Sequence, residues 1–427
     1  MRFLIFFGWT ILGLNSFAIP DTCDACGKKP VGQWYANYHL SLTPFFSSDD
    51  SAVNHLRLDL DFHQNSNAIN TTFAGAFLQK KEISPSMKQR VLNFAGDRIA
   101  YEDELRTGLS YGRLLKKSGI TLWVSYYHRN LRFLNCPTDA FKLVFGGNKQ
   151  FEDKTINLSD IRFTNLMYNQ YSVGISKQMG AFQLGVNLSF LQGFQHQQLT
   201  TNKTSLYTAP QGEYLDVVYN FKFRQSNEGA SHYFQPNGLG GSADIHLAYQ
   251  TAKSQWSFDI TDLGVISWNK QPVSYQGDSN IRFQGVVIDD ITKIGSLRLD
   301  SFLKDLLPKK TTSSYTTLLP FTVQAVYSKP VALKKGNVLV VNIGVNTRNL
   351  YKYNALAFVK LNFLLKQQWS ISTSASYGGY SNFALGFEVG KKSKWVDAVL
   401  GTSNLIGSLV PMYYPGSSVY FRVAGKF

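Results

Sequence analysis

Two cysteines near the N-terminus have a spacing that can do chemistry. Cys23 and Cys26 form a C-x-x-C motif, the spacing of redox-active dithiols and of zinc half-sites. Both functions need more than the pair, either a helix N-terminus that stabilises a thiolate or two further ligands, and the sequence offers neither nearby. We therefore favour a local disulfide between Cys23 and Cys26, formed in an oxidising compartment. We predict no metal site.

Motifs typical of enzymes are absent from the rest of the chain. It contains no HExxH zinc motif, no phosphate-binding Walker sequence and no hydrolase nucleophile elbow. The stretch Gly238 to Ala243 resembles a dinucleotide fingerprint, but no strand of the buried type precedes it, so we interpret it as a turn. The histidines are scattered. We therefore expect a protein that is not an enzyme, with no catalytic residues, no cofactor-binding residues and no cofactor.

Charged residues alternate with apolar ones in several stretches, so an extended strand would place the charges together on one face. Such charges would line the interior of a sheet closed on itself, and they include Arg57, Asp59, Asp61, Arg106, Asp216, Lys222, Arg224, Asp259, Arg348, Lys360, Glu388 and Arg422. They could form ion pairs that rigidify a small, filled interior, or they could line a passage that weakly favours anions. Pairing is favoured because an unpaired charge in a narrow interior is costly.

The elements that would position these charges are β-strands. Along Ser418 to Phe427 and along Phe182 to Phe190, apolar and polar residues alternate with the period of two that is typical of a strand. From Trp369 to Tyr377 every second residue is serine. Several apolar faces begin or end with Trp, Tyr or Phe, as the aromatic girdles of a membrane barrel require. The opposite faces favour Ser, Asn, Gln and Gly, which suits a wet lumen better than the exterior of a secreted β-sandwich.

The first eighteen residues are typical of a secretory signal peptide. Arg2 supplies the positive charge, Phe3 to Leu14 supply the apolar region, and Ser16 and Ala18 are the small residues before a cleavage site. We predict cleavage between Ala18 and Ile19, which leaves residues 19–427 as a single barrel domain. No later apolar stretch is long enough for a membrane-spanning helix, which needs about 20 residues, so only strands could cross a membrane.

The sequence therefore predicts an all-β fold, an antiparallel up-and-down transmembrane β-barrel of about 14 strands within a range of roughly 12 to 18. Three segments interrupt the strand pattern: a helix that starts at Ser84-Pro85 and stops near Gly96, a helix from Thr138 to Phe145, and a helix from Asp300 to Leu307. Each is a candidate for a plug, a lid or a cap, or else for a helical turn in a long loop. The third carries three apolar residues that could form a lid: Phe302, Leu303 and Leu306.

The net charge of +15 can indicate nucleic acid, an anionic membrane surface or a cationic pore as the partner. An exported protein rarely meets nucleic acid, so we expect outer-membrane lipid and lipopolysaccharide, and no nucleic acid.

The last strand carries Val419, Phe421 and Val423 on one face and ends with Phe427. In this the chain resembles bacterial outer-membrane barrels, in which an aromatic C-terminus is a signal to the barrel-assembly machinery. An unpaired edge strand gives that machinery something to pair with.

Two further stretches indicate a family. One runs from the glycines at 238, 240 and 241 to Trp268, and the other runs from Phe145-Gly-Gly-Asn148 to Leu158. With the terminal strand, they resemble the Bacteroidota outer-membrane barrels called domain-of-unknown-function family 5723, a group that is similar to the long-chain fatty-acid transporter type of barrel. The chain departs from that family after the signal, where an expected Asn-Pro segment is missing, so an N-terminal plug does not follow from the resemblance.

The resemblance and the candidate lid together favour a barrel that binds or admits a small apolar or amphipathic ligand. The alternative is a barrel that transports nothing and serves as a scaffold or accessory subunit, with other outer-membrane proteins as partners. An apolar pocket inside the barrel would favour the first function, and a large exposed apolar patch on a loop would favour the second.

Overall fold

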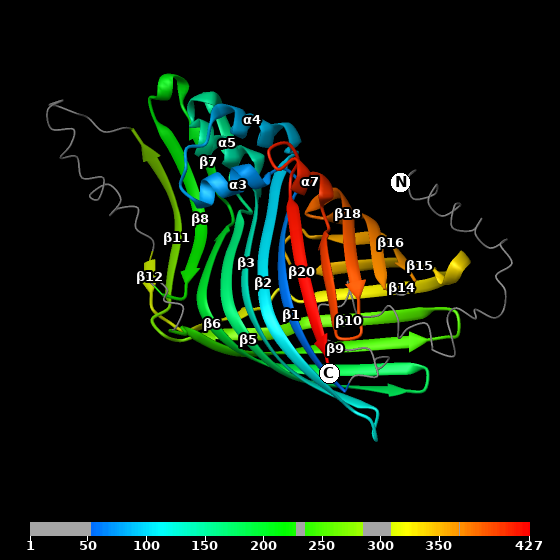
Figure 1. Cartoon of the computed structure of the whole chain (residues 1–427). Helices are drawn as coiled ribbons and strands as arrows, with labels where there is room; N and C mark the ends of the chain where they lie inside the picture. Colours follow the sequence, from blue (N-terminus) through cyan, green and yellow to red (C-terminus); the bar gives the residue numbers. More distant parts are fainter. Residues whose placement is uncertain (1–52, 228–234, 285–308, 367) are drawn as a thin grey trace.

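The computed structural model describes residues 53–227, 235–284, 309–366 and 368–427. Within these ranges, fourteen antiparallel strands form one closed barrel, as the sequence predicts (Figure 1). In order around the wall they are β1 (Asn54–Ser66), β2 (Arg98–Leu115), β3 (Ile120–Pro137), β5 (Arg162–Met179), β6 (Phe182–Thr201), β9 (Gly238–Gln250), β10 (Gln255–Trp268), β14 (Thr322–Ala332), β15 (Val338–Arg348), β16 (Asn354–Leu365), β17 (Trp369–Gly379), β18 (Ser381–Lys392), β19 (Val396–Thr402) and β20 (Ser417–Lys426).

The first and last of these strands close the barrel. The backbone N–H of Asn54 donates to the carbonyl oxygen of Phe427 at 2.9 Å, and β1 and β20 remain paired from His55 to Gln64. Closure leaves neither strand with a free edge in the wall. Both ends of the barrel chain lie with the short hairpin turns, and the longer connections lie at the opposite end.

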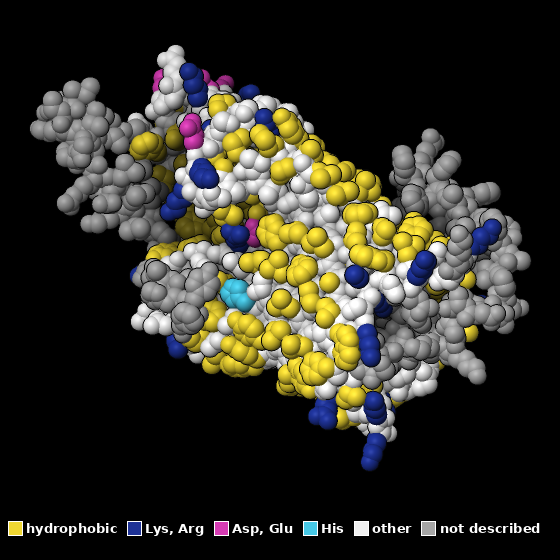
Figure 2. Space-filling view, viewed as in Figure 1, with side chains coloured by type: hydrophobic (Ala, Val, Ile, Leu, Met, Phe, Trp, Pro, Cys, Tyr) yellow, Lys and Arg dark blue, Asp and Glu magenta, His cyan; other side chains and the backbone are white. Residues whose placement is uncertain are grey.

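The wall has its apolar side chains outside and its polar side chains inside. On β1, Leu58 is 50% exposed whereas its neighbour Asp59 is 4% exposed. On β15, Asn342 is buried in the interior while Val345 lies exposed on the outer surface. Figure 2 shows apolar side chains spread over the outer face of the strands. Among the described residues, no helix has both the length and the apolar composition to span a membrane.

A second group of short strands extends the wall beyond the closed ring at the long-loop end. It contains β4 (Lys154–Asn157), β7 (Ser205–Thr208), β8 (Leu215–Gln225), β11 (Val273–Phe283) and β12 (Lys309–Thr311), while β13 (Tyr315–Leu318) pairs with the end of β10. Strand β6 changes its partner here, because residues 182–193 pair with β9 and residues 197–201 pair with β8.

The prediction that Asp216 and Lys222 line the lumen is therefore wrong. Both lie on β8, in the extension, where Asp216 pairs instead with Arg282 of β11 at 2.7 Å. Alternation identifies β8 as a strand. It cannot show that β6 extends beyond the end of β9, so that the last residues of β6 are left to pair with β8. The prediction for Arg224 is wrong for the same reason, because it lies at the far end of β8, where its guanidinium is 5.3 Å from the centroid of the Tyr315 ring.

Helices cap the long-loop end of the barrel (Figure 1). They are α3 (Thr71–Leu78), α4 (Pro85–Phe94), α5 (Thr138–Gly146) and α7 (Leu405–Leu409), and short 3₁₀ turns occupy Lys149–Phe151, Pro210–Gly212 and Lys334–Gly336. The helices predicted after Ser84 and from Thr138 are confirmed. The Ser84 hydroxyl accepts the N–H of Met87, and Pro85 takes the first helical position, where a missing N–H costs nothing.

The cap has its own apolar core. Phe73 of α3 packs against Phe141 of α5, with ring centroids 5.4 Å apart, and Val91 of α4 is fully buried beside them. Cys136, at the end of β3, is buried in the same core.

Several predictions fall outside the described residues: the signal peptide with its cleavage site at Ala18 and Ile19, the Cys23–Cys26 disulfide, and the lid helix with Phe302, Leu303 and Leu306. These remain predictions.

Candidate functional site

A group of buried charges joins opposite walls of the barrel near the long-loop end. We call Glu102, Glu104, Arg129, Asp262 and Arg348 the ion belt. Arg348 of β15 donates from Nη2 to Oε2 of Glu104 at 2.9 Å and also pairs with Glu102, both on β2. Arg129 of β3 donates from Nε to Glu104 at 2.9 Å and from Nη1 to Asp262 of β10 at 2.6 Å. Each of these side chains is almost completely excluded from solvent, so the lumen is closed at this level.

His63 of β1 adjoins the ion belt and, with Glu102 and Glu104, offers donor atoms that all lie within 4.8 Å of one another. Such a trio could hold a cation if its charges were free. The guanidiniums of Arg129 and Arg348 already neutralise those carboxylates. A divalent cation at this position would be repelled by the two guanidiniums. We therefore assign the trio to the ion belt.

Six of the charges predicted to line the lumen lie on inner faces of the barrel wall: Arg57, Asp59, Arg106, Asp259, Arg348 and Arg422. Arg57 and Arg422 both contact Asp59, with Nε of Arg57 at 2.8 Å from Oδ1 and Nε of Arg422 at 3.4 Å from the same oxygen. The hydroxyl of Tyr127 donates to Oδ2 of Asp59 at 2.9 Å, and Arg106 covers the Tyr127 ring at 4.1 Å. Asp259 pairs with Nδ1 of His246 at 2.6 Å, and Arg348 belongs to the ion belt.

Sequence reasoning missed the other four members of the belt. Glu102 and Glu104 alternate as inward residues of a strand should, and this spacing was a usable signal. Asp262 could not be found that way, because a bulge between Ile260 and Leu263 turns both Thr261 and Asp262 inward. The φ angle of Asp262 is 63°, a left-handed value that aspartate tolerates better than most residues.

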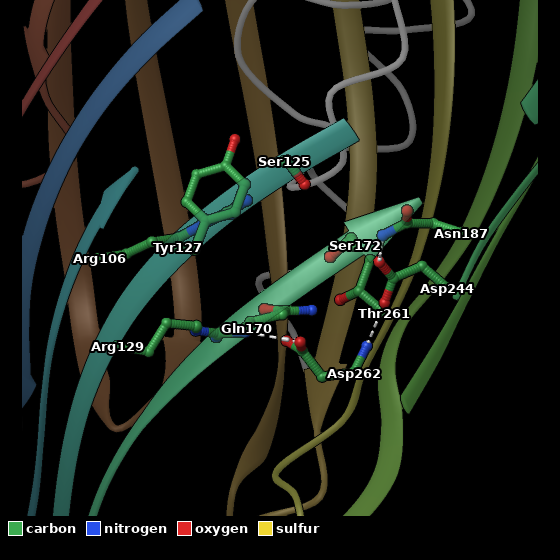
Figure 3. A pocket seen from close by; sticks show the side chains of 10 residues that line it. All are labelled: Arg106, Ser125, Tyr127, Arg129, Gln170, Ser172, Asn187, Asp244, Thr261 and Asp262. Atoms are coloured by element: carbon green, nitrogen blue, oxygen red, sulfur yellow. Dashed lines mark hydrogen bonds and ion pairs between the residues drawn. The ribbon is translucent and has the colours of Figure 1, made fainter. Parts of the chain in front are cut away.

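A small polar cavity beside the belt shows how little space remains (Figure 3). Its volume is about 10 Å³, roughly the space of one water molecule. Asp244 lies on its edge, accepting from the amide of Asn187 at 2.7 Å and from the backbone N–H of Asp262 at 2.7 Å. At this level, side chains fill the lumen.

A larger cavity lies at the long-loop end. We call it the mouth cavity; its volume is about 280 Å³. Eight of its fourteen lining residues are apolar or aromatic: Phe133 of β3, Phe163 and Leu166 of β5, Leu199 of β6, Leu318 of β13, Pro320 before β14, and Leu350 and Tyr351 after β15. The other six are polar, and among them the guanidinium of Arg162 lies 5.1 Å from the centroid of the Tyr351 ring.

Glycines shape the wall on one side of the mouth cavity. Trp268 and Ile266 of β10 lie fully buried against Gly193 of β6 and against Gly238 and Gly240 of β9. A Cβ at Gly193 would lie 2.5 Å from Cη2 of Trp268. The same buried cluster includes Leu166, which lines the cavity. The prediction of a turn at Gly238 is therefore wrong: β9 begins there, and the glycines make room for Trp268.

His196 lies where β6 changes its partner, beside this cluster. Its ring stacks on Trp268 with centroids 5.4 Å apart, and its Nδ1 is 2.9 Å from the Tyr315 hydroxyl. The residue has a structural role in joining β6, β10 and β13.

Solved structures that resemble the chain are bacterial barrels. The toluene transporter TbuX of Ralstonia pickettii is 9% identical, with 88% of this chain and 90% of that chain covered and a TM-score of 0.44. A FadL homologue of Pseudomonas aeruginosa is 8% identical, with 96% and 94% covered and a TM-score of 0.43. The translocator domain of the autotransporter NalP from Neisseria meningitidis is 8% identical, with 89% and 90% covered and a TM-score of 0.36. Similarity at this level transfers no ligand and no activity.

No curated protein matches the sequence. The model of a protein family does match, over residues 52–403, which is most of the chain. The chain therefore belongs to the family of unknown function DUF5723.

Proposed function

We propose that this protein is an outer-membrane barrel that binds a small apolar or amphipathic ligand in its mouth cavity. The observation that carries the proposal is a cavity of about 280 Å³, lined by apolar, aromatic and polar side chains, at the mouth of a barrel whose lumen is crossed by the ion belt. Apolar and aromatic side chains that bury a ligand, with polar groups that orient it, are typical of small-molecule sites. The proposal includes the Bacteroidota source that the sequence resemblance implies.

The outer surface supports the membrane location. Leucines on β1, valines on β3 and β5, and Trp256 on β10 are exposed on the outer wall, whereas charged residues such as Asp59 and Glu388 are buried inside the barrel. In water this distribution would expose a very large apolar area. In a bilayer the apolar outer face of the wall would contact lipid, and the polar inner face would contact the lumen. Export requires the predicted signal peptide, whose cleavage would give Ile19 as the mature N-terminus.

The composition of the mouth cavity defines the ligand class. Phe133 and Leu166 offer contact to a hydrocarbon or an aromatic ring, and Arg162 offers a cation to a polar end group. Its volume limits the bound portion to a small molecule or to one end of a longer chain.

The test is binding of 1-aminoanthracene, a fluorophore that brightens in apolar surroundings, to the full chain in detergent micelles. We expect saturable binding that Leu350→Trp abolishes by filling the cavity. Leu333→Trp, in the turn before β15, adds the same side chain at the other end of the barrel and should leave binding unchanged. Equal binding by all three proteins would exclude the mouth cavity as the site.

A second candidate function is that of a scaffold in an outer-membrane complex, and one observation favours it. The cap exposes large apolar side chains, among them Phe77 at 56%, Val144 at 72% and Leu409 at 72%. Exposed apolar residues that gather on a loop surface are typical of protein contacts. If cross-linked partners are lost with the double variant Val144→Glu and Leu409→Glu while 1-aminoanthracene binding by the parent protein is absent, the scaffold function is the correct one.

A further inference from the structure

The short-turn end of the barrel carries a ring of lysines. Hairpin turns join β2 to β3, β5 to β6, β9 to β10, β14 to β15, β16 to β17, and β18 to β19 at this end. Exposed lysines lie in these turns or within a few residues of them: Lys116, Lys117, Lys177, Lys253, Lys334, Lys366, Lys391 and Lys394. The turn sequences contain no Asp and no Glu. We call this ring the basic rim.

At the opposite end of the barrel, the connections carry both acidic and basic residues. There, acidic residues such as Glu82 and Asp153 are interspersed with Lys80, Lys88 and Lys154. Figure 2 shows the contrast, with dark-blue side chains along the edge where the short turns lie and both colours near the cap. Turns that carry lysine without any acidic residue are therefore a property of the short-turn end.

Exposed aromatic side chains accompany the basic rim. Nζ of Lys391 lies 5.1 Å from the centroid of the Trp369 ring, and Nζ of Lys394 lies 4.7 Å from that of Trp395. Trp256, which is 57% exposed, packs against Tyr327 on the outer wall just beyond the β9–β10 turn. Exposed Trp and Tyr at one level of a barrel mark the boundary between hydrocarbon and headgroups, so the lysines lie at headgroup level.

We propose that the basic rim binds the anionic headgroups of phospholipids in the leaflet that surrounds the short turns. Lysine side chains are long enough to keep their stems on apolar surface and place the ammonium group among headgroup phosphates. The lysines are distributed over hairpins all around the wall, which fits a shell of lipids better than a single patch for an acidic protein. The inference rests on the proposed membrane location and is independent of the mouth cavity and its ligand.

Tryptophan quenching by brominated lipids tests this, because Trp256, Trp369 and Trp395 are exposed on the outer wall near the rim. The full chain is reconstituted in phosphatidylcholine vesicles that contain either brominated phosphatidylglycerol or brominated phosphatidylcholine. The rim variant carries Lys116→Gln, Lys117→Gln, Lys334→Gln and Lys366→Gln, which leaves the lysines over Trp369 and Trp395 in place. The matched control carries Lys80→Gln, Lys81→Gln, Lys149→Gln and Lys154→Gln at the long-loop end.

For the parent protein we expect the anionic lipid to bind about fivefold more strongly than the zwitterionic one, the factor equivalent to about 1 kcal/mol for a lysine near an anionic surface. The preference should weaken in high salt. It should largely disappear in the rim variant and persist in the control. No preference in the parent protein, or the same preference in the rim variant, would overturn the proposal. If neither brominated lipid quenches, the barrel is not embedded, and the membrane location fails together with the basic rim.

Discussion

The Nη2 atom of Arg348 lies 2.9 Å from Oε2 of Glu104, although β15 and β2 are on opposite sides of the fourteen-strand barrel. One ion pair therefore reaches across the lumen, and the two walls must approach closely at this level. The mouth cavity adjoins this contact, because its lining includes Phe133, which pairs with Glu102, and Leu350, two residues after Arg348. Further ion pairs line the inner wall toward the short-turn end, among them Arg57–Asp59 and Lys360–Glu388.

Opening the ion belt should make the barrel conduct ions. Arg348→Ala removes the link to Glu102 and Glu104 and leaves their buried charges short of a partner. We expect the parent protein to show little conductance in planar bilayers and the variant to conduct several-fold more, with a loss of stability of about 3–5 kcal/mol, as is typical when one partner of a buried pair is removed.

Arg282→Ala is the matched control, because Arg282 pairs with Asp216 in the extension, away from the barrel lumen. It should leave conductance unchanged. A parent protein that already conducts as well as Arg348→Ala would show that the belt does not close the lumen.

Arginine should be tolerated differently at two adjacent positions of β15. Val341 is on the outer face and Asn342 on the inner face, where its amide lies 5% exposed. An arginine at mid-membrane on the outer face costs about 2–4 kcal/mol, so Val341→Arg should reduce the yield of folded barrel far more than Asn342→Arg. Heat-modifiable mobility on gels measures this, and equal yields would refute the assignment of faces or the bilayer itself.

Removal of Phe427 should lower the amount of assembled barrel. The residue directly follows β20, is 60% exposed, and its backbone pairs with Asn54. We expect slower recognition of the last strand by the assembly machinery, and therefore less folded protein at equal synthesis. Lys426, its neighbour, provides the comparison: if Lys426→Gln and deletion of Phe427 have the same effect, the aromatic side chain has no special role in assembly.

The glycines of β9 should differ sharply in their tolerance of a methyl group. A Cβ at Gly240 would collide with the carbonyl oxygen of Val265, whereas a Cβ at Gly241 would lie 3.5 Å from the carbonyl oxygen of Ser189, an ordinary contact. Overpacking of this kind costs about 1–3 kcal/mol. Urea unfolding should show Gly240→Ala to be less stable than the parent protein and Gly241→Ala to be similar to it. The reverse order would contradict the packing of Val265 and Ile266 of β10 against β9.

Most of the barrel could be predicted from the sequence because each strand shows an alternation of apolar and polar residues within its own segment. The alternation at Leu339, Val341 and Ile343 fixes the outer face of β15 without knowledge of any partner, and a proline after Ser84 is enough to place the start of α4. Pairing is not local. The residues near β8 do not show that this strand lies outside the barrel wall. Those near Gly238 do not show that Trp268, thirty positions later, packs against this glycine.

Less of the candidate site could be predicted from the sequence, because its residues also come together through pairing of distant segments. Arg348 was recognised as a lumen charge, but its partners Glu102 and Glu104 lie far away in sequence, and their proximity follows only from closure of the barrel. Asp262 turns inward through a bulge that breaks the alternation on which the prediction relied. The residues that line the mouth cavity come from four strands and from the loop after β15, so no single stretch of sequence could reveal it.

The most direct test of the account is the position of a bound ligand that contains a heavy atom. Crystals of the full chain soaked with bromobenzene should show anomalous bromine density in the mouth cavity, between Leu166, Leu318 and Leu350, with the Arg348–Glu104 contact intact beneath it. Leu350→Trp crystals, treated in the same way, should lack that density. Bromine density along the lumen past a separated Arg348 and Glu104, or an empty mouth cavity in both crystals, would contradict the account.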